Sequence, residues 1–158
     1  MRSYGIIVGY VILCSIFYQS LLKAKLLYYF DVLGITGCLA IVIGKFACLL
    51  EGHGCYGTYT NLPWGMYFKY GNEPSLIPVH PTPLYDSILH LLLFFLLIKI
   101  RNSKTNDGVL FWIFILGTSA NNIIVETVRN NEAYIGYLSV AQLFYLWCFI
   151  TSCFFLKR

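Results

Sequence analysis

Five apolar runs, each about as long as a membrane-spanning helix, dominate this sequence. They are Tyr4–Leu22, Leu26–Leu50, Pro83–Ile100, Val109–Val128 and Tyr137–Leu156. A helix needs about 20 apolar residues to cross the hydrocarbon core of a bilayer. The composition agrees, because only 11% of the residues are charged, whereas soluble domains have about 25%. The sequence therefore predicts an all-α integral membrane protein, with one transmembrane domain over residues 1–158 and about five transmembrane helices.

The basic residues indicate the orientation of these helices. They gather after the first run, after the third run and at the end of the chain: Lys23, Lys25, Lys99, Arg101, Lys104, Lys157 and Arg158. With five spans these places share one side of the membrane, which the positive-inside rule makes cytoplasmic. We therefore expect a cytoplasmic C-terminus, and we expect the N-terminus and the loop between the second and third runs to face outward. The first run has no evident cleavage site, so we expect it to be retained as a span.

Two other classes of protein are not supported by the sequence. Five of the six cysteines lie inside the apolar runs, which leaves Cys55 alone in a loop and argues against a disulfide framework. The net charge of +4 follows from the topology, and no basic surface with interleaved aromatic residues suggests nucleic acid as a partner. We also expect no cofactor.

Polar residues inside the second run are the first functional signal. An ionisable side chain at the centre of a span costs about 2.5 to 3.5 kcal/mol, so each one needs a partner or a purpose. Lys45, Cys48 and Glu51 follow one another at about one helical turn and place an ammonium, a thiol and a carboxylate on one face. Lys45 could instead extend to the outer headgroups. Asp31, near the other end of this run, is expected to be an interfacial carboxylate beside the preceding lysines.

The fourth run carries a second polar stripe. Asn122, Glu126 and Arg129 are spaced four and three residues apart and therefore share one face of a helix. Such a stripe must face the bundle interior or a wet cavity, because its groups would be unsatisfied in hydrocarbon. The alternative is a purely structural pair of Glu126 and Arg129, with Asn122 bonded to a neighbouring helix.

The loop between the second and third runs adds histidines at the same level of the membrane. Glycines in Gly-His-Gly-Cys-Tyr-Gly, residues 52–57, permit a turn that presents His53 inward. His80 and Tyr85 stand at the outer mouth of the third run, where His80 could also be only a capping or interfacial residue. Two cations together with carboxylates, histidines and aromatic side chains suit an anionic lipid headgroup.

These residues resemble the signature region of bacterial prolipoprotein diacylglyceryl transferases. The matching pieces are Lys45, Cys48, Gly52-x-Gly-Cys-Tyr-Gly57, Leu62-Pro63-Trp64-Gly65 and His80-Pro81-Thr82-Pro83-Leu84-Tyr85-Asp86. Ile123-Ile124-Val125-Glu126-x-x-Arg129 and Gly136-x-Leu-Ser-x-Ala-Gln142 resemble the last two helices of the family. The likeness spans nearly the whole chain, and typical members have further helices before the position of Tyr4.

The resemblance implies an activity and its surroundings. A diacylglyceryl group would move from phosphatidylglycerol to the lipobox cysteine thiol in the signal peptide of a prolipoprotein, and glycerol phosphate would leave. The leaving phosphate needs cationic neutralisation, and the thiol needs a base. The resemblance also implies a multi-pass protein of the bacterial inner (plasma) membrane, surrounded by membrane lipids, with its active face outward.

The resemblance also assigns roles to single residues. Lys45 takes the position of a phosphate-binding arginine, Gly57 that of a closing glycine, and Glu126 and Arg129 fall on the family's Glu-x-x-Arg. The expected substrate-binding residues are Lys45, Cys48, Glu51, Gly57, Tyr85, Asn122 and Arg129. The expected catalytic residues are His53, His80, Glu126 and Tyr4, with His53 or His80 favoured as the base.

Two departures from the family pattern motivate an alternative. Asn122 stands where the family usually has arginine, and Ser3 or Tyr4 replaces a histidine. A non-catalytic relative that binds lipid or a partner protein is therefore the second hypothesis. A metal site is not expected, because the spacing of the nearby histidines and cysteines fits no usual zinc pattern: Cys48, His53, Cys55 and His80.

Overall fold

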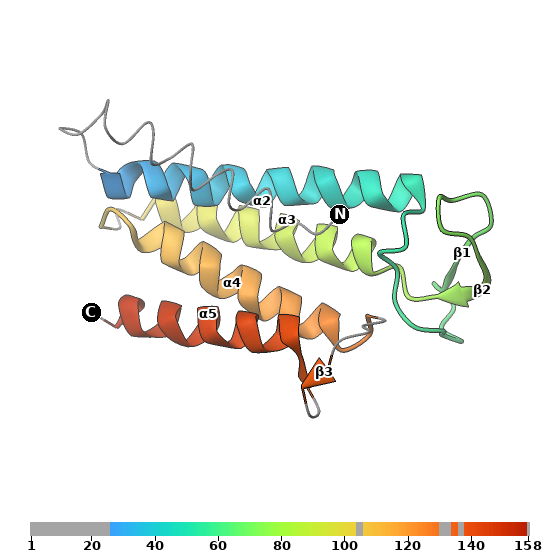
Figure 1. The fold of residues 1–158 in the computed structure, drawn as a ribbon. Helices are drawn as coiled ribbons and strands as arrows, with labels where there is room; N and C mark the ends of the chain where they lie inside the picture. The colour runs from blue at the N-terminus through green and yellow to red at the C-terminus, as the bar shows by residue number, and fades with distance from the viewer. Residues whose placement is uncertain (1–25, 104–105, 130–133, 136–137, 158) are drawn as a thin grey trace.

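Four apolar helices form the part of the chain that the computed structural model describes, which is residues 26–103, 106–129, 134–135 and 138–157. They are α2 (Leu26–Glu51), α3 (Thr82–Arg101), α4 (Val109–Glu126) and α5 (Val140–Leu156). Figure 1 shows them side by side, with α2 and α5 on opposite sides of the bundle. The first predicted span, Tyr4–Leu22, lies outside the described residues.

Three of these helices confirm the predicted membrane-protein class. α2, α3 and α4 are long and apolar enough to cross a membrane, while α5 is a shorter apolar helix of 17 residues. The bounds of α2 and α3 differ from the predicted runs by at most one residue at each end, and α4 ends two residues early. The length of an apolar run thus locates these helices well, because the hydrocarbon core sets that length.

The helices pack through a small apolar core. α3 packs against both α2 and α4, and α4 also contacts α2 and α5. Buried residues from three helices meet at the centre of this packing: Ile35, Cys38, Leu93, Leu97 and Leu110. α2 and α3 are antiparallel neighbours, as are α3 and α4, so the end of α2, the start of α3 and the end of α4 meet at one end of the bundle (Figure 1).

Two short β-hairpins, which the sequence did not predict, accompany the helices of this all-helical bundle. β1 (Met66–Phe68) pairs antiparallel with β2 (Ser75–Val79), and together they project beyond the ends of α2 and α3 (Figure 1). β3 (Tyr134–Ile135) pairs with β4 (Leu138–Ser139) directly before α5. Strands of two to five residues leave almost no periodic signal in a sequence.

The β1–β2 hairpin is tied to the glycine-rich loop that precedes it. Tyr56 stacks on Phe68, with ring centroids 5.0 Å apart, and donates its hydroxyl to the carbonyl of Glu73 at 2.6 Å. Partial burial and the nearby Glu73 carboxylate raise the pKa of Tyr56. The loop and the hairpin therefore pack as one unit at the end of the bundle.

The start of α5 corrects the predicted fifth run, which began at Tyr137. The helix begins at Val140 because Ser139 is its N-cap, with an extended backbone at φ −71° and ψ 153°. Its hydroxyl accepts the Gln142 N–H at 3.1 Å, and the Gln142 side chain accepts the Ser139 N–H at 2.9 Å. This reciprocal capping box fixes the helix start more sharply than hydropathy does.

Asp31, which was expected beside the preceding lysines, has partners within the bundle that the sequence did not indicate. Its side chain is buried, and its two oxygens accept the N–H groups of Gly108 and Phe111 at 2.7 and 2.8 Å. The first N–H groups of a helix have no partner within the helix, and the N-cap Gly108 has no side chain to supply one. A carboxylate from α2 therefore caps α4 at the end of the bundle away from the β1–β2 hairpin.

We expect Asp31→Asn to lower the free energy of unfolding by about 1 to 3 kcal/mol. The asparagine side chain has one acceptor oxygen in place of two, so one of the two N–H groups that Asp31 caps loses its hydrogen bond. Thermal unfolding in detergent measures this effect. Asp107→Asn is the matched control, since Asp107 is an exposed carboxylate in the loop before α4. Equal unfolding temperatures for the two variants would contradict the capping role.

Candidate active site

Two cations and two carboxylates meet at the end of the bundle that carries the β1–β2 hairpin. Lys45 Nζ of α2 lies 2.5 Å from Asp86 Oδ2 of α3. Arg129, which follows α4, lies 3.4 Å from the same oxygen and 3.3 Å from Glu126 Oε2. We call Lys45, Asp86, Glu126 and Arg129 the four-charge cluster. One buried oxygen of Asp86 thus connects the two cations.

The carboxylates of this cluster are buried, and its cations are partly exposed. The side chains of Asp86 and Glu126 are 0% and 3% exposed, whereas those of Lys45 and Arg129 are 20% and 22% exposed. The cluster is formally neutral, but its accessible part is cationic. An ammonium and a guanidinium have more N–H donors than these ion pairs use, so both can still bind the oxygens of an anion such as a phosphate.

Gly57 fastens the glycine-rich loop to the backbone just before Arg129. Its N–H donates to the carbonyl of His80 at 2.8 Å, and the next N–H, of Thr58, donates to the carbonyl of Val128 at 2.9 Å. A Cβ at Gly57 would lie 2.2 Å from the Val128 oxygen. Only glycine permits this approach, which holds the segment that carries Arg129 against the start of α3.

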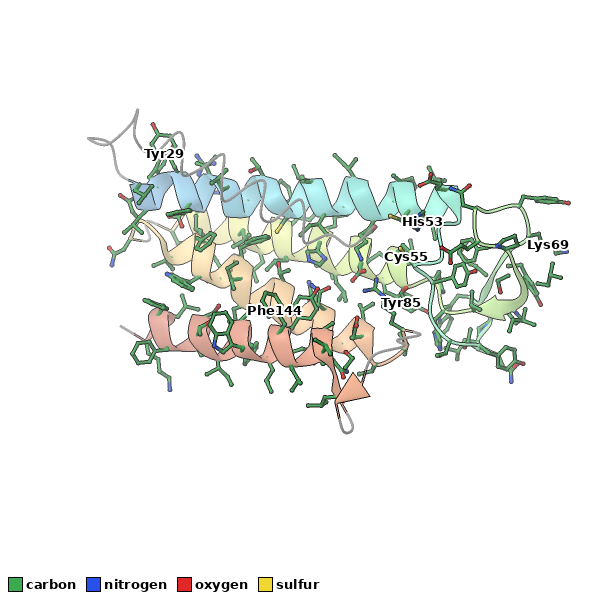
Figure 2. All side chains as sticks on the ribbon, viewed as in Figure 1. Tyr29, His53, Cys55, Lys69, Tyr85 and Phe144 are labelled. Atoms are coloured by element: carbon green, nitrogen blue, oxygen red, sulfur yellow. The ribbon has the colours of Figure 1, made fainter. Side chains whose placement is uncertain are left out.

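His80 and Tyr85 lie together at the start of α3. His80 Nδ1 is 3.2 Å from the Tyr85 hydroxyl, which also accepts the indole N–H of Trp64 at 2.9 Å. Figure 2 shows Tyr85 where the bundle meets the hairpin, near His53 and Cys55. Tyr85 therefore holds the imidazole of His80, and main-chain bonds to Gly57 and Thr58 hold its backbone, at the same end of the bundle as the four-charge cluster.

The remaining predicted site residues lie around the cluster without joining its ion pairs. His53 Nδ1 contacts the Cys55 thiol at 3.9 Å, and Cys48 lies half-buried in the last turns of α2. Glu51 is exposed and accepts the side-chain N–H of Asn72 at 3.0 Å. Asn122 donates to the carbonyl of Thr118, one turn earlier in α4, at 2.8 Å.

The structure thus brings Lys45, Glu126 and Arg129 together but gives Glu51 and Asn122 other partners. Tyr4 lies outside the described residues. Among the residues that are described, no group of three or more His, Cys, Asp or Glu side chains could hold a metal ion. The two partly exposed cations of the cluster favour an anion as the ligand of the site.

Asp86 is the member of the cluster that sequence reasoning missed. In the sequence it is the last residue of the His-Pro-Thr-Pro-Leu-Tyr-Asp stretch, and no role was predicted for it. A signal was available, because a carboxylate in an apolar helix needs a partner within the membrane. Lys45 and Arg129 were both already placed at the same depth.

Comparisons with known proteins identify the family of this chain. The whole chain, residues 1–158, matches the family described as prolipoprotein diacylglyceryl transferase.

Three similar proteins are phosphatidylglycerol–prolipoprotein diacylglyceryl transferases. The one from Synechocystis sp. is 30% identical over 151 residues, which cover 88% of this chain and 52% of that protein. The one from Finegoldia magna is 31% identical over 144 residues, or 90% of this chain and 55% of that protein. The one from Clostridium tetani is 33% identical over 118 residues, or 73% and 47%.

The chain spans about half the length of the curated relatives that it matches. The match to the family nevertheless covers residues 1–158 of this chain. This chain belongs to the prolipoprotein diacylglyceryl transferase family.

Proposed function

We propose that this chain transfers a diacylglyceryl group from phosphatidylglycerol to the thiol of a lipobox cysteine in a prolipoprotein. The observation that carries the proposal is the four-charge cluster, in which the accessible groups are the cations Lys45 and Arg129 and the carboxylates lie behind them. Such a site suits the phosphate of an anionic lipid. The names of the similar proteins specify their donor lipid and the class of their acceptor.

The proposed reaction is a substitution at a glycerol carbon. The thiolate sulfur bonds to this carbon, the bond from the carbon to the phosphate oxygen breaks, and glycerol phosphate leaves with the electron pair. Lys45 and Arg129 stabilise the negative charge that develops on the leaving phosphate. His80 is our preferred base for the thiol proton, because Tyr85 holds its ring. His53 stays the alternative.

We further propose that the chain crosses the membrane five times, with residues 4–22 as the first span. The end of the bundle with the β1–β2 hairpin then faces outward from the bacterial plasma membrane. Lys99 and Arg101 in the last turn of α3 and Lys157 after α5 lie at the opposite end, and the positive-inside rule assigns that end to the cytoplasm. A phospholipid of the outer leaflet and the signal peptide of a prolipoprotein could meet at the outward end.

The proposal is tested with the purified chain in phosphatidylglycerol vesicles and a lipobox peptide. Mass spectrometry should detect the diacylglyceryl thioether of the peptide and an equal amount of glycerol phosphate. A peptide with serine in place of the cysteine should give neither product. If the lipid and the peptide both bind but no thioether forms, the chain is instead a non-catalytic lipid-binding relative. Asn122 would then explain the lack of activity, because its amide donates to a carbonyl of its own helix and adds no positive charge to the site.

A further inference from the structure

Asp86 is the group through which the two cations of the four-charge cluster are connected. It lies on α3, Lys45 lies on α2, and Arg129 follows α4. Its Oδ2 atom contacts Lys45 Nζ at 2.5 Å and Arg129 Nη2 at 3.4 Å. Three helices therefore depend on one carboxylate oxygen to bring their charges to a single place.

The burial of Asp86 shows that these contacts hold the carboxylate. Its side chain is 0% exposed, and a buried carboxylate without a partner is strongly unfavourable. Its other oxygen, Oδ1, has no hydrogen-bond partner among the described residues. The two cations that contact Oδ2 therefore offset the free-energy cost of burying the charge.

The same geometry constrains the cations. Two positive groups repel each other, and this repulsion is stronger near a protein interior than in water. Without an anion between them, Lys45 and Arg129 would turn away from each other toward the headgroups. With Asp86 between and beneath them, both keep their accessible sides free for one further anion, because only the cations of this trio are partly exposed.

We propose that Asp86 is a positioning residue for diacylglyceryl transfer. It sets the spacing of Lys45 and Arg129 so that both contact one phosphate group, and it does not itself contact the lipid. This inference rests on the proposed function. It differs from a purely structural role because it concerns the relative placement of the cations in the folded protein.

Asp86→Asn separates positioning from substrate binding. The change keeps the shape of the side chain, removes its charge and leaves the cluster with one net positive charge. An anionic lipid should then bind at least as well in the ground state. The cations, however, lose the spacing at which both stabilise the departing phosphate. The expected result is a kcat lowered by about tenfold or more, with a KM for phosphatidylglycerol that is unchanged or lower.

The experiment measures kcat, KM and thermal unfolding for the full chain and three variants in mixed micelles of phosphatidylglycerol. Asp86→Glu keeps the charge but displaces it by one methylene, so part of kcat should return. Asp31→Asn is the matched control, because it neutralises a buried carboxylate that accepts two N–H bonds at the other end of the bundle. It should lose thermal stability and keep both kinetic constants.

Three outcomes would overturn a role for Asp86 in positioning. The first is that Asp86→Asn loses thermal stability and keeps its kcat, as Asp31→Asn does. The second is that the KM of Asp86→Asn rises several-fold, as expected for a group that binds the lipid. The third applies if Asp86→Asn does not fold, and it is a wild-type kcat for Asp86→Glu. Absence of product with the unaltered chain would instead reject the proposed function, and this inference with it.

Discussion

Replacing Lys45 by alanine is expected to lower kcat/KM for diacylglyceryl transfer by about a hundredfold to a thousandfold, the usual effect of removing one charge-stabilising donor. Lys45 is one of the two partly exposed cations of the four-charge cluster, so its loss removes half of the positive charge available to a phosphate. The substitution also leaves the buried Asp86 with only the longer contact to Arg129, at 3.4 Å. The vesicle assay with a lipobox peptide measures the loss.

Lys69→Ala is the matched control for Lys45→Ala. Lys69 is an exposed cation at the same end of the molecule, on the hairpin segment, and lies over the ring of Tyr67 at 5.9 Å from its centroid. Figure 2 shows it well away from Tyr85. If Lys69→Ala lowered kcat/KM as much as Lys45→Ala does, general attraction of anionic lipids would explain the effect, and the cluster would not.

Gly57→Ala is expected to destabilise the fold by about 1 to 3 kcal/mol and to lower the activity of the protein that still folds. The added methyl group would lie 2.2 Å from the Val128 oxygen and 2.9 Å from His80 Cβ, so one of these segments must move. Val128 directly precedes Arg129. Because misplacing a reacting group by about 1 Å can cost a hundredfold in rate, the displaced guanidinium should reduce kcat as well.

The chain offers an exact counterpart for this substitution. A Cβ at Gly44, in α2, would meet no atom within 4 Å. Gly44→Ala should therefore raise the unfolding temperature slightly, since alanine is favoured over glycine inside helices, and should keep turnover. Equal behaviour of the two alanine variants would show that the contact of Gly57 with the segment before Arg129 is unimportant.

The sequence predicted the helices far better than it predicted their contacts. The bounds of α2 and α3 followed from apolar length alone, a local property of the chain. Lys45, Glu126 and Arg129 could be placed together because Lys45 interrupts one apolar run and the other two lie at the end of another run, at the same expected depth of the membrane. Whether two such groups touch depends also on the rotation of each helix about its axis, which hydropathy does not determine.

Contacts that leave no pattern in the sequence account for what could not be predicted. The capping role of Asp31 was missed because its partners are main-chain N–H groups at the start of α4, and every sequence has such groups. Asn122 lies on the predicted stripe, yet its amide bonds the preceding turn of its own helix. The hairpin of β1 and β2 was missed because strands of three and five residues depend on their partners for stability.

The two buried carboxylate sites also bear on how the bundle fits the bilayer. Asp31 and Lys45 are separated along α2 by a rise of about 21 Å, at about 1.5 Å per residue. The hydrocarbon core of an ordinary bilayer is about 30 Å thick. The polar ties at the two ends of the bundle therefore cannot both lie at the boundaries of an undeformed membrane. Because α2, with 26 residues, is itself long enough to span that core, at least one of the two ties lies below the membrane surface, where burial against partners within the protein has to satisfy its charge.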